Sequence, residues 1–197
     1  MPATIITNTI KVKKANGVKA KLGMLIVLTN TFLGVTTAQT LRPANEASSV
    51  NFSIKNFGLW VKGSLSNLNG TINYNPENPL QTTAQITLDP STINTGIAAR
   101  DNHLRKPEYF DVANYQTISF VSTSVTATQT PGLYFMMGRL TIKGTTKQIG
   151  LAFTASPQHR GYLFKSDFTI QRTQFGIGGK SLAMADEVKI NLHILAQ

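Results

Sequence analysis

The 197-residue chain has room for one domain, an apolar fraction of 41% that can fill a core, and a formal net charge of +10. Five lysines and no acid lie within residues 1–38, so the rest of the chain carries only 10 − 5 = +5 and holds no basic run with interleaved aromatics, which argues against a nucleic-acid-binding surface. The absence of cysteine excludes disulfides, thiolate metal sites, cysteine nucleophiles and a lipidated N-terminal cysteine.

The first 38 residues have the order of an export signal. A lysine-rich stretch precedes an apolar run at residues 22–35, which polar residues interrupt and which is too short to span a bilayer comfortably. Small residues suited to signal peptidase follow, so we expect a signal peptide over residues 1–38 with cleavage after Ala38. The expected location is the periplasm or the outside of the cell, with no membrane span in the mature chain. An uncleaved anchor or a basic arm is the alternative.

Residues 39–48 are polar and are expected to form a flexible leader, and residues 49–197 a barrel domain. Eight or nine short runs in the latter alternate apolar and polar side chains, which is typical of strands buried on one face. In the first run, Val50, Phe52 and Ile54 share a face. An antiparallel meander of this size removes its open edges by closing. The sequence therefore predicts an all-β protein, an eight-stranded antiparallel barrel.

The alternation stops between residues 91 and 114, where the pattern becomes helix-like. Ile97 and Leu104 would share one face of a short helix, and Pro107 would end it. Because this is the one interruption in a series of strands, we expect the helical segment to lie across one end of the barrel as a cap.

Two other features have plainer interpretations than they first suggest. The glycine-rich stretch at residues 175–181 lacks the glycine spacing of a phosphate-binding loop, so we interpret it as a turn before the last strand. His103, His159 and His193 are isolated, without a second ligand at a short, fixed spacing. Neither a metal site, a cofactor nor a catalytic residue is predicted.

Residues 100–111 concentrate charge in a chain of which only 14% is charged. On a helix, Asp101 and Arg105 have the favourable acid-before-base spacing, so one interpretation is a structural lid held by ion pairs. The other is a ligand contact at the barrel mouth, where a planar arginine fork suits a diphosphate head group. A lid can also bind a ligand. The candidate mouth residues are Arg100, His103, Arg105 and Tyr109.

The apolar side of the alternating runs supplies candidates for lining a narrow pore. They are Phe52, Ile54, Ile72, Ile86, Leu88, Phe120, Phe135, Met137, Phe153, Phe168, Ile190 and Leu192. The alternative is that these side chains fill a solid core, and the residues alone favour that alternative.

Ordered blocks of sequence cover nearly all of residues 49–195. They read SSVNFSIKNFG, VKGSLSNLNGTINYNP, LDPSTINTG, RDNHLRKPEYFD, YQTISFVST, GRLTIKGTTKQIGL, IQRTQFGIG and LAMADEVKINLHI. Together they resemble the YceI-like family of exported, lipocalin-like proteins. The resemblance implies a lipocalin-like barrel around an elongated apolar pore, which in some members is associated with a polyisoprenoid chain. The chain departs from the family at Asn56, where a histidine is usual, and at Gln116, where a proline is usual.

The leading hypothesis is an exported protein that sequesters or carries a polyisoprenoid, quinone or similar lipid in its pore without chemistry. One alternative is a structural or stress-response barrel with a filled core. Another is an enzyme acting on a prenyl compound at the mouth, with Asp101 and His103 as acid or base, although these two would point to different sides of a helix. The expected partner is thus a long-chain isoprenoid or other lipid and no nucleic acid; self-association into a homodimer is left open.

Overall fold

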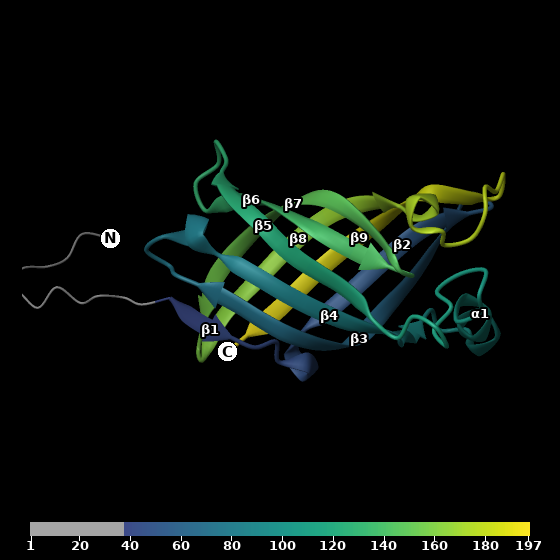
Figure 1. Ribbon diagram of the computed structural model, residues 1–197, viewed down its shortest axis with the longest axis horizontal. Helices are drawn as coiled ribbons and strands as arrows, with labels where there is room; N and C mark the ends of the chain where they lie inside the picture. Colours follow the sequence, from purple (N-terminus) through teal and green to yellow (C-terminus); the bar gives the residue numbers. More distant parts are fainter. Residues whose placement is uncertain (1–37) are drawn as a thin grey trace, which may run out of the picture. The chain divides into compact units, whose positions relative to one another are not determined.

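The computed structural model describes residues 38–197, and the expected signal peptide lies outside them except for Ala38. None of the helices in this part of the chain is long and apolar enough to cross a membrane. Strands predominate, and one α-helix and three short 3-10 helices join them (Figure 1). The elements are β1 (Gln39–Leu41), η1 (Asn45–Ala47), β2 (Ser49–Asn56), β3 (Leu59–Tyr74), η2 (Pro79–Gln81), β4 (Thr83–Asn94), α1 (Ala98–Leu104), β5 (Ile118–Ala127), β6 (Leu133–Ile142), β7 (Thr145–Gln158), β8 (Gly161–Gln171), η3 (Arg172–Phe175) and β9 (Met184–Ala196).

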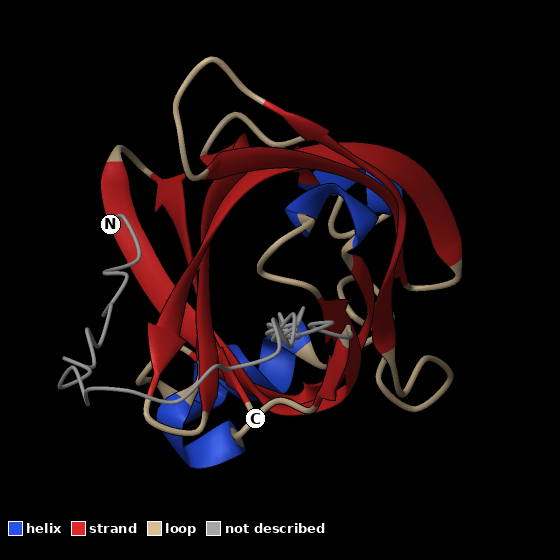
Figure 2. Cartoon of the chain, turned by 90° about the vertical axis from the view of Figure 1, so that its left-hand side faces the viewer, coloured by secondary structure: helices blue, strands red, loops and turns tan. Residues whose placement is uncertain are grey.

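Strands β2 to β9 form a closed antiparallel barrel. Each strand pairs with the next along the chain, and the ring closes because β9 also pairs with β2. Seen end-on, the strands encircle the interior without an open edge (Figure 2). The predicted eight-stranded antiparallel barrel with a short helix at one end is confirmed. Closure pairs every backbone edge, which protects a strand-rich chain against edge-to-edge aggregation.

The expectation of a flexible leader at residues 39–48 is wrong. β1 pairs with the last residues of β3, Ile72 to Tyr74, and the side chain of Leu41 is buried. Arg42 and Gln197 then exchange two backbone hydrogen bonds, of 2.9 and 3.0 Å, at the end of β9. β1 and β2 are therefore two parts of one interrupted strand between β3 and β9, and residues 39–48 belong to the barrel domain.

The helix begins later than the sequence pattern indicates. β4 continues to Asn94 and pairs with β3 there, so residues 91–94, expected to be helical, are strand. α1 then makes two turns, in which alanines with high helix propensity lead. Ile97, expected on the buried side, precedes the helix and is 53% exposed, while Leu104 does face the barrel interior.

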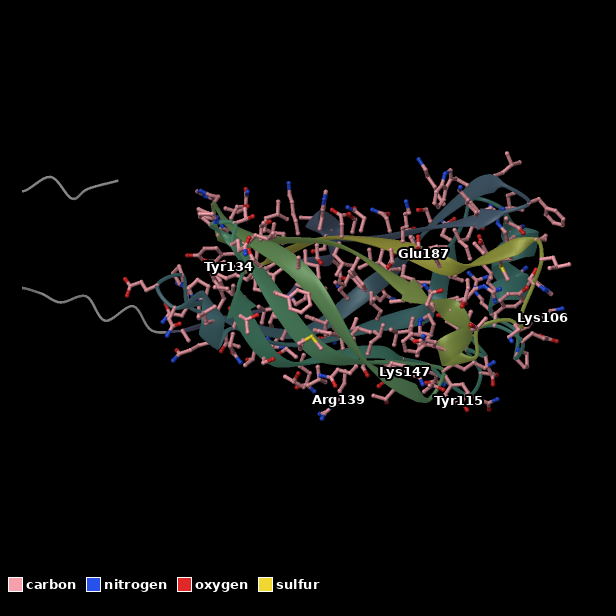
Figure 3. The ribbon with its side chains drawn as sticks, turned by 90° about the horizontal axis from the view of Figure 1, so that it is seen from above. Lys106, Tyr115, Tyr134, Arg139, Lys147 and Glu187 are labelled. Atoms are coloured by element: carbon pink, nitrogen blue, oxygen red, sulfur yellow. The ribbon has the colours of Figure 1, made fainter. Side chains whose placement is uncertain are left out.

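The two ends of the barrel are closed differently. We call the end with the β3–β4 and β7–β8 connections the tyrosine end, because Tyr74 packs edge-on against Tyr162 and Phe164, with ring centroids 4.6 and 5.3 Å apart. The lid end carries α1 with residues 105–117, and η3 with residues 176–183. Figure 3 labels Tyr134, which adjoins Phe153 with ring centroids 5.6 Å apart at the tyrosine end, and Lys106 and Tyr115 at the lid end.

Candidate functional site

The barrel encloses a cavity of about 260 Å³ that side chains from all eight barrel strands line. A cavity of roughly 150 Å³ is enough to hold benzene, so this one has room for a slim ligand. It runs from Thr82, near the tyrosine end, to Arg100 at the lid end. Ten of the twelve predicted pore residues line it: Phe52, Ile54, Ile72, Ile86, Leu88, Phe120, Phe153, Phe168, Ile190 and Leu192.

The other two predicted pore residues lie on the outer face of the barrel. Phe135 is 39% exposed, and its ring lies over Gly150 of the neighbouring strand together with the sulfur of Met137. Met136 and Leu140, one position out of phase with the prediction, line the cavity instead. The run from 133 to 138 is almost entirely apolar, so alternation alone does not say which side faces inward.

Two glycines on the inner face make room for aromatic rings. A Cβ on Gly63 would lie 2.4 Å from the Phe52 ring, and one on Gly138 would lie 2.3 Å from the Phe120 ring. The far end of each ring therefore lies close against the backbone of the adjacent strand. These glycines were not predicted as part of the site, although each stands where the alternation requires an inward side chain.

The polar side chains along the cavity gather mainly at the lid end. Asn56, Thr95, Arg100, Tyr109 and Arg172 lie there, against an otherwise apolar wall. The exceptions away from this end are few: Thr82, Lys165 and Ser166. The cavity is thus apolar along its length and polar at one end, which is the distribution that an amphiphilic chain would require.

Arg100 is placed at this polar end by its own strand-to-helix connection. Its Nε donates to the Thr95 hydroxyl at 2.7 Å, and its Nη2 donates to the Thr95 carbonyl at 2.9 Å. Among the described residues no hydrogen bond is found for Nη1, so one side of the guanidinium fork is left for a further acceptor. Tyr109 lines the same end of the cavity, and the His103 ring meets it edge-on with centroids 5.1 Å apart.

The two other predicted mouth residues, His103 and Arg105, do not line the cavity. Arg105 joins α1 to the end of β4, because its Nε donates to the Ser91 carbonyl at 2.7 Å and its Nη2 to the Ile93 carbonyl at 3.0 Å. His103 is exposed. The mouth contact expected for Arg105 is therefore replaced by a structural one.

Asp101 is buried beneath the lid and accepts hydrogen bonds from the backbone N–H of Thr95, at 2.8 Å, and from its hydroxyl. The Thr95 hydroxyl, more than the nearby charges of Arg105 and Arg100, holds the pKa of Asp101 below its ordinary value. The main contact of the Asp101 carboxylate is therefore Thr95 and not the expected ion pair with Arg105. No hydrogen bond joins Asp101 to His103 in the described part of the chain, so the structure does not assemble the acid–base pair of the enzyme alternative.

A buried arginine, missed by the sequence analysis, organises the second half of the lid end. Arg172 is only 3% exposed, and its guanidinium donates to four backbone carbonyls. Three of the distances are 2.9 Å to Ala185, 2.8 Å to Ile177 and 3.0 Å to Gly179. The fourth, to Met184, is 3.3 Å. These bonds hold the segment between η3 and β9 against the barrel.

Asp186 stands beside this arginine and joins η3 to β9. Burial alone raises its pKa, but hydrogen bonds from the Thr173 N–H and hydroxyl, at 2.9 and 2.8 Å, together with the charge of Arg172, lower the pKa overall. The ionised carboxylate is therefore part of the native arrangement of the lid end at neutral pH.

The two halves of the lid end are joined to each other through backbone carbonyls. The Lys143 ammonium, from the β6–β7 turn, donates to Pro107 at 2.5 Å and to Gly176 at 3.1 Å. The N–H of Gly178 donates to the Glu108 carbonyl at 2.8 Å. The lid end is thus one hydrogen-bonded unit. In residues 38–197 no group of three His, Cys, Asp or Glu side chains is close enough together to hold a metal ion.

Comparison with known proteins gives one family. The model of the YceI-like domain matches residues 41–196. A UPF0312 protein from Ectopseudomonas mendocina is 33% identical over 104 residues, and Protein YceI from Salmonella arizonae is 33% identical over 103 residues. Both alignments cover 52% of this chain and 54% and 53% of the two relatives, so the chain spans about half the length of the curated relatives it matches.

Solved structures share the fold. The crystal structure of BcnA from Burkholderia cenocepacia has a TM-score of 0.73 at 23% identity, over 77% of this chain and 98% of that one. A polyisoprenoid binding domain from Saccharophagus degradans has a TM-score of 0.64 at 14% identity, over 82% and 99% of the two chains. At these identities the likeness is one of fold. With the family model matching nearly the whole barrel, the chain belongs to the family of YceI-like domains.

Proposed function

We propose that this protein binds a long-chain amphiphile, of the polyisoprenoid or quinone kind, inside the barrel. The observation that carries the proposal is the cavity of about 260 Å³, apolar along its length and polar at the lid end. The tail lies among the inward Phe, Ile and Leu side chains, and the head group lies at the lid end. A structure similar in fold is described as a polyisoprenoid binding domain, which supports the same class of ligand.

The physical chemistry of such a ligand suits this wall. An isoprenoid tail gains about 25 cal/mol for each Å² of apolar surface removed from water, and it brings few polar groups that would need partners. The rings of Phe52 and Phe120 lie close against Gly63 and Gly138, where any larger residue would crowd the tube. A barrel whose core is filled by its own side chains, the alternative hypothesis, does not account for an apolar space of this size.

The head group lies against Arg100 and Tyr109. The free Nη1 of Arg100 donates to a carbonyl, hydroxyl or phosphate oxygen, and the Tyr109 hydroxyl adds a second polar contact. Two buried charged side chains of the lid end already have partners, with Asp101 bonded to Thr95 and Arg172 to backbone carbonyls. This supports binding without chemistry. The lysine-rich, apolar order of residues 1–38 supports a site of action in the periplasm or outside the cell.

Blocking the tube tests the proposal. Ala84 lines the cavity, whereas its neighbour Gln85 faces outward and is exposed. Ala84→Phe should abolish the uptake of solanesol and ubiquinone measured by native mass spectrometry, while Gln85→Phe should take up one ligand per barrel as the unmodified protein does. Uptake that is equal in all three proteins would place the ligand elsewhere, and no uptake by the unmodified protein would overturn the proposal. The same spectra give the oligomeric state.

A further inference from the structure

Three large apolar side chains stand unburied at one tip of the lid end. Phe57, in the β2–β3 turn, and Leu59, the first residue of β3, are 80% and 73% exposed, and Leu182, in the segment before β9, is fully exposed. The Phe57 N–H donates to the Ala183 carbonyl at 2.7 Å, so the two segments adjoin. We call Phe57, Leu59 and Leu182 the apolar tip.

The turn that carries the tip is an unfavourable place for an aromatic residue. Phe57 and Gly58 both have positive φ, at 49° and 79°, and they form a two-residue connection between the paired Asn56 and Leu59. Such a turn favours asparagine or glycine at the first position, because a bulky side chain is strained there. If folding alone decided, position 57 would carry a residue such as asparagine, which suits the turn and is also polar. A strained and solvent-exposed phenylalanine points to a role outside the fold.

A basic surface with the chain's single tryptophan adjoins the tip. Trp60 faces outward on β3, and the ammonium groups of Lys55 and Lys189 lie 5.3 and 4.8 Å from its ring centroid. Lys62 lies on the same outer face, and Lys180 precedes Leu182. Segments 53–62 and 180–189 hold four lysines against two acids, Asp186 and Glu187, and Asp186 is bonded to Thr173.

We propose that the apolar tip and its lysines dock the barrel onto the surface of an anionic lipid bilayer. The tip enters the boundary between head groups and acyl chains, and Trp60 lies at head-group depth, where tryptophan is enriched in membrane proteins. The four lysines extend their apolar stems over the tip and place their charges among the anionic head groups. A second copy of the chain would not match this surface, because its own lysines would face like charges.

Docking at the tip brings the lid end of the cavity to the bilayer. Asn56 and Met184 pair with each other directly behind the tip, and both line the cavity. The docking surface goes beyond the proposed ligand and does not depend on it, since the tip, Trp60 and the lysines all lie outside the cavity. Vesicle binding and ligand uptake can therefore fail separately.

Trp60 is a reporter placed at the surface itself, since the chain has no other tryptophan. Its emission should shift to the blue, and brominated acyl chains should quench it, when the chain from Gln39 onward meets vesicles of phosphatidylcholine with phosphatidylglycerol. Both effects should weaken with added salt and with pure phosphatidylcholine. Unchanged emission with anionic vesicles would overturn the proposal.

Variants separate docking from folding and from other parts of the chain. Phe57→Asn combined with Leu59→Ser and Leu182→Ser should lower the vesicle partition coefficient about tenfold or more, since three apolar side chains are lost. Phe57→Asn also relieves the turn, so the Tm should not fall on its account. Leu80→Ser, an exposed leucine at the tyrosine end, is the matched control and should bind as before. Equal binding by the triple variant, or a tip-dependent dimer in place of vesicle binding, would contradict the proposal.

Discussion

The two ends of this barrel are closed by different physics. At the tyrosine end, the rings of Tyr74, Tyr162, Phe164 and Phe153 pack against one another. At the lid end, arginine and lysine side chains bind backbone carbonyls of loops and a short helix. Packed rings do not separate in steps, whereas hydrogen-bonded loops can open locally and close again. If the barrel binds a ligand as proposed, we therefore expect it to enter through the lid end.

Removing a ring from the tyrosine end should have the largest effect on stability. Phe164→Ala deletes a buried ring that contacts Tyr74 and Phe153, and we expect the free energy of unfolding to fall by about 3–5 kcal/mol. Phe135→Ala, on the outer face, should cost much less. Urea denaturation measures both. Equal losses would mean that the inner rings pack no better than the outer one.

Removing the buried arginine should break the lid end and leave the tyrosine end intact. Arg172→Met leaves four backbone carbonyls without their donor, so we expect a loss of about 2–3 kcal/mol. Hydrogen exchange should accelerate in residues 172–185 and not around Tyr74. Arg139→Met, exposed on β6, is the control and should change little (Figure 3). Uniformly faster exchange would show that the two ends are not independent.

Acid should loosen the lid end specifically. A carboxyl whose pKa is lowered on folding stabilises the protein above its ordinary pKa, 3.8 for Asp101, and this contribution is lost as pH falls through the lower, folded value. Asp101→Asn should therefore flatten the decline of stability below about pH 4, and Thr95→Val should do the same because it removes the main cause of the shift. Thermal unfolding as a function of pH measures this. A decline unchanged in both variants would contradict the assignment.

Alkali should act, more weakly, on the tyrosine end. Burial, and then the neighbouring Tyr134 and Tyr162, raise the pKa of Tyr74 above its ordinary value of 10.0. The neutral phenol is favoured in the folded state, so its contribution is complete below that value and declines as pH rises through it toward the higher folded pKa. Tyr74→Phe should make the Tm less sensitive to pH above about 10. The same sensitivity in the variant would assign the effect to another group.

The barrel and most of its lining could be predicted because alternation fixes the inward side wherever polar residues mark the outward one. In the run from Leu133 to Ile142 only Arg139 and Thr141 do so, and counting back from them would have placed Phe135 outside and Met136 inside. β1 was not predicted because its three residues are too few to show an alternation of apolar and polar side chains. Residues 91–94 fit both a helical and a strand pattern, and they form a strand because this segment pairs with β3.

The lid end was the least predictable part of the site. Arg172 and Arg105 bind carbonyls, which every residue carries, so no sequence pattern marks their partners. Arg100 and Tyr109 were predicted from residue type and do line the cavity, but His103 and Arg105 of the same cluster do not. Charge density located the lid correctly without separating the side chains that hold it from those that face the cavity.

The most direct test of the proposed function is native mass spectrometry of the protein as purified, followed by solvent extraction of any ligand that it carries. The account predicts an added mass, released by organic solvent, that belongs to a single long-chain amphiphile per barrel. A bare protein mass that stays unchanged after incubation with quinones and prenyl phosphates would contradict the claim that the cavity is a binding site.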